Sequence, residues 1–253
     1  MKVTILGCGT SFGVPMIACK CPVCASDDPM NKRSRSSALV GLGDRNVLID
    51  TSTDLRAQSI ANGIDHVDAV LYTHAHAEHI HGVDELRRFN WLQRASIPCF
   101  GNAETMGRIT RVFDYIFTNP GRPGWQPDLT ANIVSEPFEL FGRTVIPVEV
   151  MHGESPILGY RIGNFAYVTD FITMPERSYG LLEGLEVMVI EALRYEPHPA
   201  HVSLSQALEV VERLKPKRAV LTHMAHAFDY HEVSAALPDR VELAFDGMVL
   251  EVA

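Results

Sequence analysis

The segment that most constrains the fold is a run of histidines that directly follows a buried apolar stretch. Val67–Thr73 is predicted to form a buried strand, and the chain continues as Thr73-His74-Ala75-His76-Ala77-Glu78-His79-Ile80-His81-Gly82. Neutral imidazole and carboxylate groups are the usual ligands of zinc, manganese and iron. A solvated polar loop or an artificial tag would also explain the histidines, but a tag lies at a terminus and lacks the carboxylate and the strand. The run therefore predicts a metal site at the end of a strand.

Three further candidate ligands lie at the ends of later predicted strands. His152 follows Thr144–Met151, Asp170 ends Phe165–Asp170, and His223 follows Ala219–Thr222. A single histidine or aspartate at a strand end is most often a hydrogen-bonded structural group. Because the pattern repeats at equivalent strand ends, we expect these side chains to converge on one cleft.

Short β-branched runs alternate with amphipathic segments along the whole chain. The remaining strands are predicted at Lys2–Cys8, Ala38–Gly41, Asn46–Asp50, Ile97–Phe100, Ile157–Ile162 and Val187–Glu191, with a strand pair over Val241–Val252 that turns at Asp246-Gly247. Helices are predicted at Asp54–Ala61, Val83–Leu92, Glu104–Phe117, Leu204–Leu214 and His231–Leu237. This order fits two packed sheets with helices outside, an αββα sandwich of the α/β (α+β) class, although the pattern alone allows other topologies. We expect residues 1–253 to form a single domain.

The segment Asn119–Pro127 contains three prolines and two glycines and is predicted to be irregular. Its Trp125 and Arg122 could cover a pocket, or Trp125 could simply pack the loop down.

Composition limits the class of partner. The chain has 253 residues and a net charge of −9, and it has no apolar stretch long enough to span a membrane. Because non-specific nucleic-acid binding needs a basic face, this charge disfavours a DNA or RNA polymer as the partner. The N-terminus lacks the apolar region of a signal peptide, so we expect a cytoplasmic protein.

The five cysteines also point to metal. An odd number in a reducing compartment argues against a disulfide framework. Cys19, Cys21 and Cys24 lie within six residues, which predicts a metal site rather than three unrelated thiols. Cys8 and Cys99 are predicted to be buried small residues.

The histidine run resembles the HxHxDH signature of the metallo-β-lactamase superfamily, and the later ligand candidates resemble its later motifs in the right order. Asp50, which ends Leu48-Ile49-Asp50, resembles the first motif of that superfamily, which supports the metal loop. The resemblance implies two divalent ions, Mn²⁺ or Zn²⁺, in the cleft. It implies that one ion is bound by His74, His76 and His152, the other by Glu78, His79 and His223, and both by a bridging Asp170.

The chain departs from the superfamily pattern at Glu78, where the superfamily has an aspartate. Glu78 could still reach the ion with its longer side chain, or it could lie outside the ligand set and carry a proton.

A narrower resemblance is to the PhnP-type cyclic phosphodiesterases of the carbon–phosphorus lyase pathway. Ala18-Cys19-Lys20-Cys21-Pro22-Val23-Cys24 is similar to their three-cysteine loop. This implies that His226 completes a structural zinc site with Cys19, Cys21 and Cys24. His201 is similar to a histidine that this group and the tRNA 3′-processing endonucleases place over the metals, although it could also be a neighbour of a helix start without a catalytic role.

The resemblance implies a metal-dependent hydrolase that cleaves small, cyclic phosphate diesters through a metal-bound hydroxide. Its catalytic residues would be His201, Glu78 and Asp170, its partners a small phosphodiester and a second copy of the chain. The alternatives are tRNA 3′ processing as in ribonuclease Z, lactone or thioester hydrolysis, and a non-catalytic metal-binding role, for which the Glu78 replacement is the best support.

Overall fold

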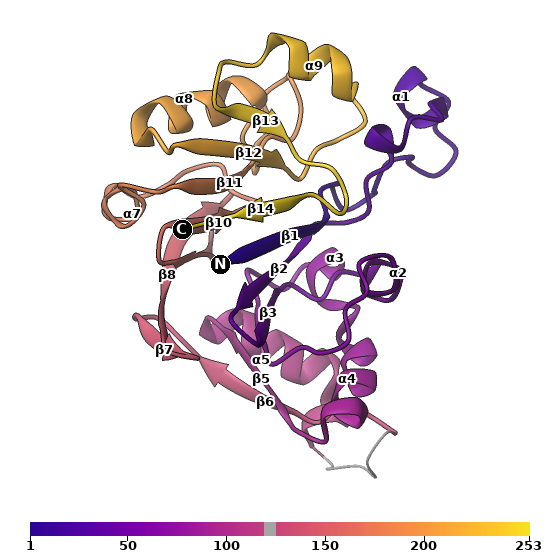
Figure 1. Cartoon of the computed structure of the whole chain (residues 1–253), viewed down its shortest axis with the longest axis vertical. Helices are drawn as coiled ribbons and strands as arrows, with labels where there is room; N and C mark the ends of the chain where they lie inside the picture. The colour runs from indigo at the N-terminus through magenta and orange to yellow at the C-terminus, as the bar shows by residue number, and fades with distance from the viewer. Residues whose placement is uncertain (119–124) are drawn as a thin grey trace.

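Two seven-stranded sheets pack face to face in the computed structural model, which describes residues 1–118 and 125–253. Figure 1 shows the first sheet running downward from β14 and β1 in the middle of the molecule to β6, and the second running from β13 near the top down the left side to β7. Helices cover the outer side of each sheet, so the predicted αββα sandwich is confirmed.

In the first sheet, β3, β4, β5 and β6 run parallel, and β14, β1, β2 and β3 pair antiparallel. Its strands, in spatial order, are β14 (Val249–Glu251), β1 (Lys2–Gly7), β2 (Ser37–Leu42), β3 (Arg45–Ile49), β4 (Ala69–Leu71), β5 (Ile97–Gly101) and β6 (Leu129–Ile133).

In the second sheet, β10 to β13 run parallel, and β7 to β10 form an antiparallel meander. Its strands, in spatial order, are β13 (Val241–Leu243), β12 (Arg218–Thr222), β11 (Val187–Glu191), β10 (Phe165–Val168), β9 (Ser155–Ile162), β8 (Arg143–His152) and β7 (Phe138–Leu140).

The helices divide between the two sheets, apart from a short helix in the projecting N-terminal segment (Figure 1). They are α1 (Pro22–Ala25), α2 (Leu55–Ala61), α3 (Ala77–Ile80), α4 (Leu86–Gln93), α5 (Ala103–Val112), α6 (Asp114–Phe117), α7 (Glu176–Leu181), α8 (Leu204–Leu214) and α9 (Tyr230–Ala236), with 3₁₀ turns at Pro29–Asn31 and Val83–Glu85. None of the helices in the described ranges has the length and hydropathy needed to cross a bilayer.

The central strands β3 and β4 of the first sheet are apolar where both of their faces are covered. In β3, Val47 and Ile49 pack into the core between the sheets, whereas Leu48 packs into a second core under the outer helices. Side chains alternate across a strand, so a strand buried on both sides must be apolar throughout. This double burial holds the strand ends rigidly.

The predicted strand pair over Val241–Val252 is wrong as a pair, because its two strands lie in different sheets. β13 pairs with β12, and β14 pairs with β1. The turn between them is anchored on the first sheet, where the carboxylate of Asp246 accepts hydrogen bonds from the backbone N–H groups of Cys8 and Ser34 at 3.1 and 2.7 Å. These hydrogen bonds fix the turn beside the first sheet, at the point where the chain crosses to it from the second sheet.

Other boundaries also differ from the predictions. The predicted helix Glu104–Phe117 is interrupted at Phe113, whose φ of −111° and ψ of 44° are not helical. Strands β6 and β7 were not predicted. The predicted irregular segment Asn119–Pro127 lies outside the described residues except for its last three, of which Trp125 is 73% exposed.

Candidate metal centre

The predicted site residues meet at one edge of the sandwich, where the carboxyl ends of the parallel strands come together. Asp50 follows β3, Asp170 follows β10 by two residues, and His223 follows β12. All three have a positive φ, of 61°, 58° and 55°, although none is glycine. Such left-handed conformations cost energy, and they concentrate at functional sites, where the rest of the fold enforces them.

Asp50 anchors the loop of residues 73–82, which carries the histidine run, through hydrogen bonds. Its carboxylate accepts hydrogen bonds from the backbone N–H and the hydroxyl of Thr73, both at 2.8 Å, and from Nδ1 of His79 at 2.7 Å. Because His79 donates its Nδ1 proton to Asp50, its Nε2 lone pair is free to bind a metal. This contact explains why an aspartate at the end of β3 supports the loop, as the resemblance implies.

The histidines of the first predicted metal position lie against one another. The ring centroids of His74 and His76 are 4.6 Å apart, and those of His76 and His152 are 5.0 Å apart. Nδ1 of His152 donates to the backbone oxygen of Asp170 at 2.7 Å, which leaves its Nε2 free. The structure therefore brings these three predicted ligands together beside Asp170.

The second predicted position is equally compact. Ligand atoms of Glu78, His79, Asp170 and His223 all lie within 4.8 Å of one another. The carboxylate of Glu78, on the first turn of α3, thus reaches the position where the superfamily has an aspartate. The longer side chain does not place this carboxylate out of reach.

Buried polar atoms without partners test whether these residues suit metal ions. Nε2 of His74, His79 and His223 lie 3.9, 3.4 and 3.2 Å from the Asp170 carboxylate. These three nitrogens and Oδ1 of Asp170 are buried, yet they form no hydrogen bond with any described residue. Leaving a buried polar group unpaired costs about 1–3 kcal/mol, so these four orphaned atoms around Asp170 fit bound cations.

The electrostatics agree with metal binding. Burial, offset only in part by the charge of Asp170, lowers the pKa of His223 to about 3. Its imidazole is therefore neutral at physiological pH, which is the form that coordinates a metal. The pKa of Asp170 is held well below its usual range because the surrounding histidines, His223 first, outweigh the effect of burial.

His201 lies at the edge of this cluster and is oriented by a residue that the sequence analysis did not single out. Its Nδ1 donates to the carboxylate of Glu191 at 2.9 Å, and the other oxygen of Glu191 accepts from the backbone N–H of Phe171 at 2.8 Å. Burial opposes the charged form of His201, but Glu191 outweighs it, and the pKa of His201 is raised. Burial raises the pKa of Glu191 to about 7.

Glu191 could have been found by the rule that identified Asp170 and His223. It is the charged last residue of an otherwise apolar strand, and it is fully buried. We refer below to the side chains gathered here as the strand-end cluster, which consists of His74, His76, Glu78, His79, His152, Asp170, Glu191, His201 and His223.

A cavity of about 190 Å³ opens beside the first metal position. We call it the α5 cavity, because its walls are formed by His74, His76 and His152 on one side and by Thr105 and Arg108 of α5 on the other. This cavity provides space for a small molecule next to the predicted ligands.

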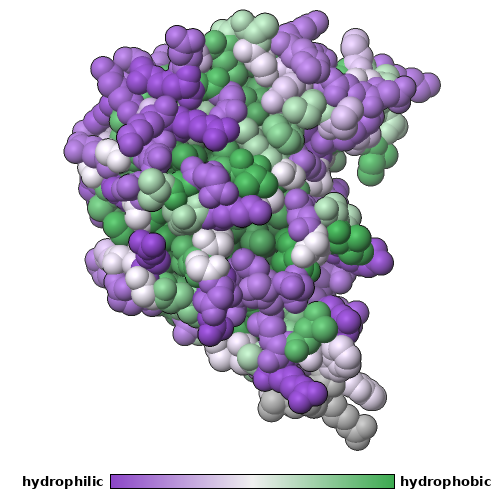
Figure 2. Space-filling view, viewed as in Figure 1, coloured by the Kyte–Doolittle hydropathy of each residue, from purple (hydrophilic) through white to green (hydrophobic). Residues whose placement is uncertain are grey.

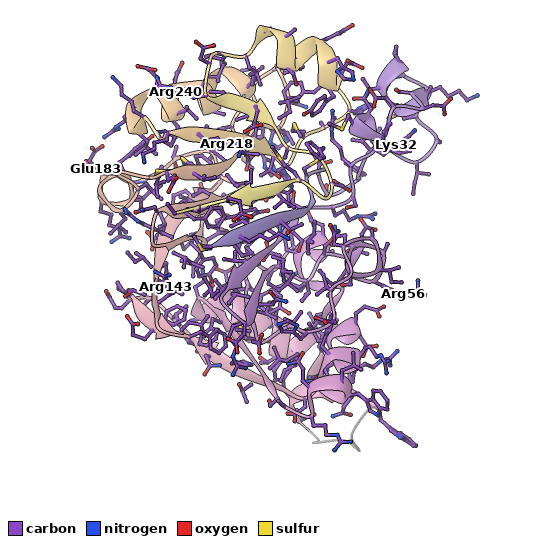
Figure 3. The ribbon with its side chains drawn as sticks, in the orientation of Figure 1. Lys32, Arg56, Arg143, Glu183, Arg218 and Arg240 are labelled. Atoms are coloured by element: carbon purple, nitrogen blue, oxygen red, sulfur yellow. The ribbon has the colours of Figure 1, made fainter. Side chains whose placement is uncertain are left out.

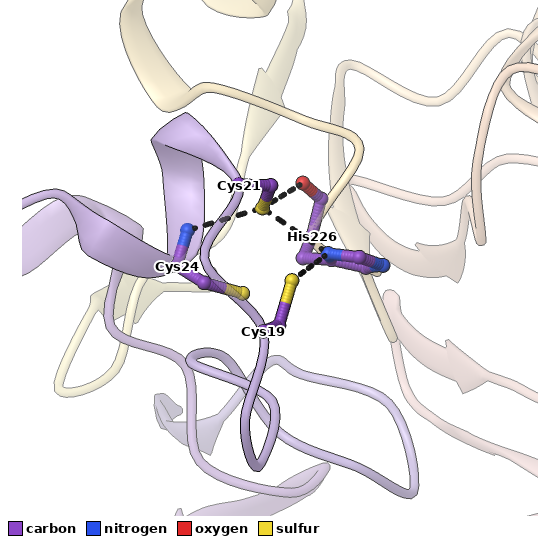
Figure 4. Close-up of side chains that lie close together, drawn as sticks. All are labelled: Cys19, Cys21, Cys24 and His226. Atoms are coloured by element: carbon purple, nitrogen blue, oxygen red, sulfur yellow. Dashed lines mark hydrogen bonds between the residues drawn. The ribbon is translucent and has the colours of Figure 1, made fainter.

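The three cysteines of the predicted cysteine site lie on the N-terminal segment that projects from the molecule in Figure 1, and His226 meets them from the loop after β12 (Figure 4). Ligand atoms of Cys19, Cys21, Cys24 and His226 lie within 4.8 Å of one another. Nδ1 of His226 is 3.3 Å from the sulfur atoms of both Cys19 and Cys21. Three thiols and one imidazole at this spacing match a closed tetrahedral zinc site, and we call these four residues the cysteine cluster.

Arg33 ties the cysteine cluster to the second sheet. Its guanidinium is almost fully buried and donates to the backbone oxygens of Ala225 and Phe228 at 3.1 and 2.7 Å. These two residues flank His226 in the loop that follows β12. The loop therefore carries His223 to the strand-end cluster and His226 to the cysteine cluster.

Comparisons with known proteins identify the class. Residues 45–224 match the model of the beta-lactamase superfamily domain, and the chain belongs to this superfamily. Together with the histidine and aspartate cluster, this membership makes the protein a metal-dependent hydrolase of the metallo-β-lactamase fold.

A more particular similarity is to a solved diphosphatase from the PhnP family, with 40% identity, a TM-score of 0.93, and coverage of 100% of this chain and 98% of that one. Zn²⁺-bound PqqB from Methylobacterium extorquens has the same fold, at 20% identity and a TM-score of 0.80, with both chains fully covered. The predicted resemblance to PhnP-type proteins is thus confirmed.

One curated relative has a different name. An octanoyltransferase from Porphyromonas gingivalis is 35% identical over 98% of this chain, but the match covers only 51% of that protein. The chain therefore spans about half the length of this relative, and the name describes the longer protein.

Proposed function

We propose that the protein is a metal-dependent phosphodiesterase that acts on small phosphate diesters, cyclic ones included. The observation that carries this proposal is the convergence of orphaned, buried ligand atoms on Asp170, directly beside the Glu191–His201 pair. Two metal positions beside a histidine poised to give up a proton are what hydrolysis of a phosphodiester needs. The similar diphosphatase of the PhnP family also breaks bonds to phosphorus.

The metal positions define the first part of the reaction. His74, His76 and His152 would hold one ion and Glu78, His79 and His223 the other, with the Asp170 carboxylate between them. Divalent ions bound there would make a water molecule more acidic, orient a phosphoryl oxygen and offset the developing negative charge. Asp50 keeps His79 in the tautomer that suits this task.

His201 supplies the second part. Glu191 holds the Nδ1 proton of His201 and raises its pKa, so that Nε2 can carry a proton near neutral pH. A protonated imidazole at the rim of the metal positions can donate that proton to the departing oxygen. Glu191 acts through His201 and is a positioning residue.

A tRNA 3′-processing activity would use the same cluster but is less well supported. The net charge of −9 opposes an RNA polymer. Figure 3 shows the labelled basic side chains spread over different parts of the molecule, and Arg218 and Arg240 pair with Glu242 and Glu212. The chain between Asp170 and His201 is used for α7 and β11, both built into the second sheet layer.

A substrate panel tests the proposal. Protein purified with Mn²⁺ or Zn²⁺ should hydrolyse bis(p-nitrophenyl) phosphate and 2′,3′-cyclic AMP, and it should act far more slowly on a precursor tRNA, a lactone and an acyl thioester. His76→Ala should lose this activity, whereas His231→Ala, an exposed histidine that pairs with Asp28, should retain it. Cleavage of the tRNA or the thioester without any hydrolysis of the small diesters would overturn the proposal.

A further inference from the structure

The α5 cavity presents a cation that the proposed reaction does not use. On α5, Met106 and Ile109 are buried against the first sheet, whereas Arg108 is exposed and lines the cavity. Arg108 is the single lysine or arginine among the described residues that form this cavity. Its guanidinium therefore faces the same space as His74, His76 and His152.

Arg108 is also free of competing partners. Glu104 lies one turn earlier on the same helix, an arrangement in which glutamate and arginine commonly pair. Nevertheless, within residues 1–118 and 125–253 the guanidinium of Arg108 makes no ion pair or hydrogen bond with Glu104 or with any other group. Its five N–H donors remain available for a ligand, and a planar guanidinium suits phosphate oxygens.

The α5 cavity continues into a larger groove, so a ligand can extend past Arg108. Glu104 and Pro156 line both spaces, and the groove has a volume of about 580 Å³ between α5, β8 and α7. Glu104 borders both spaces and does not distinguish them, but Arg177 and Glu136 line only the groove, where Arg177 is already paired with Glu149 and Glu136 adds negative charge. An anionic group is thus favoured at Arg108 and disfavoured farther along, where there is room for an organic substituent.

We propose that Arg108 binds a second, non-reacting phosphoryl group, so that the substrates this protein prefers are diesters of diphosphate rather than of monophosphate. This inference rests on the proposed phosphodiesterase function and names the substrate class for that site. The phosphorus that reacts lies at the metal positions, and the neighbouring phosphoryl group lies in the α5 cavity against the guanidinium. The oxygen of a water molecule bonds to the reacting phosphorus while the bond from that phosphorus to the bridging oxygen breaks. The bridging oxygen leaves with the neighbouring phosphoryl group, the protons of the water pass to the two products, and both products are phosphate monoesters. Arg108 is a specificity-determining residue that contacts the substrate.

Two substrates with matched organic groups test this inference. Diadenosine 5′,5′-diphosphate carries two phosphoryl groups, and adenylyl-(3′→5′)-adenosine carries one. In Arg108→Gln, the ratio of kcat/KM for the first to that for the second should fall roughly ten- to a hundredfold, the range for a lost charged hydrogen bond, mainly through KM. Arg108→Lys should retain part of the ratio, because it keeps the charge.

Arg111→Gln is the matched control, because Arg111 is exposed on the same helix but does not line the cavity. In Arg111→Gln, the ratio of kcat/KM for the diphosphate diester to that for the monophosphate diester should equal the ratio of the unmodified protein. An equal ratio in Arg108→Gln, or hydrolysis of bis(p-nitrophenyl) phosphate by the unmodified protein with no hydrolysis of the diphosphate, would overturn the inference and leave the phosphodiesterase proposal standing. Failure to hydrolyse any of the three diesters would instead overturn the proposed function.

Discussion

The strand-end cluster and the cysteine cluster hold similar ligand types by different means. The first is built on the ends of doubly covered strands, and its histidines and carboxylates are mostly buried. The second is built on a projecting segment, where Ile17 is 91% and Phe12 67% exposed, and where Figure 2 shows hydrophobic residues at the surface. The ligands of the strand-end cluster are thus held by the two sheets, whereas those of the cysteine cluster depend on loop contacts such as the hydrogen bonds of Arg33 to Ala225 and Phe228.

The two clusters also differ in whether their ligands leave room for a substrate at the metal. The cysteine cluster offers four ligand atoms for one ion, which leaves no coordination position for a substrate. The strand-end cluster opens to the α5 cavity and has a histidine–glutamate pair at its rim. The strand-end cluster is therefore suited to catalysis, and the cysteine cluster to stabilising the fold.

Replacing Asp170 should have the largest effect. Asp170→Asn keeps a residue that tolerates the left-handed backbone, but it removes the charge on which three imidazoles converge. We expect kcat/KM for bis(p-nitrophenyl) phosphate to fall roughly 10²- to 10³-fold or more, with the circular dichroism spectrum unchanged. Full activity in a folded Asp170→Asn protein would remove the basis for calling this cluster the catalytic one.

Replacing Glu191 should have an intermediate effect. Glu191→Gln can still accept a hydrogen bond from His201, but it no longer stabilises the charged imidazole. We expect kcat to fall about 10- to 100-fold, the usual scale for a group that orients a functional side chain. Metal content, measured by mass spectrometry, should stay at the level of the unmodified protein, and a loss of metal as large as that in Asp170→Asn would make Glu191 a ligand instead.

Replacing a cysteine should affect stability rather than chemistry. Cys21→Ser removes a ligand of the cysteine cluster, so one zinc ion per chain should be lost and the thermal midpoint should fall by several degrees, about 2–4 °C for each kcal/mol. The kcat on the small diester should change less than about threefold, since the strand-end cluster keeps all its ligands. Cys99→Ser is the control for zinc content and kcat only, because Cys99 lies in β5, outside this cluster, and is fully buried, so that a serine there lowers the thermal midpoint by itself. A large loss of kcat with unchanged zinc content would reverse the roles of the two regions.

The smallest effect concerns thiol reactivity in metal-free protein. A backbone hydrogen bond from Cys24 is the main cause that lowers the pKa of Cys21 to about 6, whereas burial raises the pKa of Cys24 to about 11. At pH 7.5 Cys21 is therefore mostly thiolate and should react with iodoacetamide before Cys24, as peptide mass spectrometry can follow. The preference should shrink as pH falls through about 6, because Cys21 is then protonated, and zinc should protect both thiols.

The sequence was sufficient to predict the layers of the fold and most of the cluster, for a physical reason. Histidines and acids at the ends of apolar strands are costly unless they are used, so Asp170 and His223 stand out even without a structure. The same reasoning extends to Glu191, a buried charge at the end of the otherwise apolar strand β11.

What could not be predicted depends on contacts between distant parts of the chain. The crossing of residues 244–248 between the sheets is fixed by the Asp246 carboxylate and its bonds to Cys8 and Ser34. The strand β6 owes its place to pairing with β5 and not to any pattern of its own, since its residues are largely polar or exposed. Arg108 stands in an ordinary helical sequence, and only the cavity gives it a role.

The most direct test of the account is a metal titration of the stripped protein, with hydrolysis of bis(p-nitrophenyl) phosphate followed at each step. We expect the first equivalent of zinc to raise the thermal midpoint with little hydrolysis, because it enters the cysteine cluster. Hydrolysis should then rise with the next two equivalents of Zn²⁺ or Mn²⁺ and reach a plateau. Binding of three ions per chain with no hydrolysis at any metal loading would contradict the proposal that the strand-end cluster hydrolyses phosphate diesters. The protein would then be a metal-binding protein without this activity.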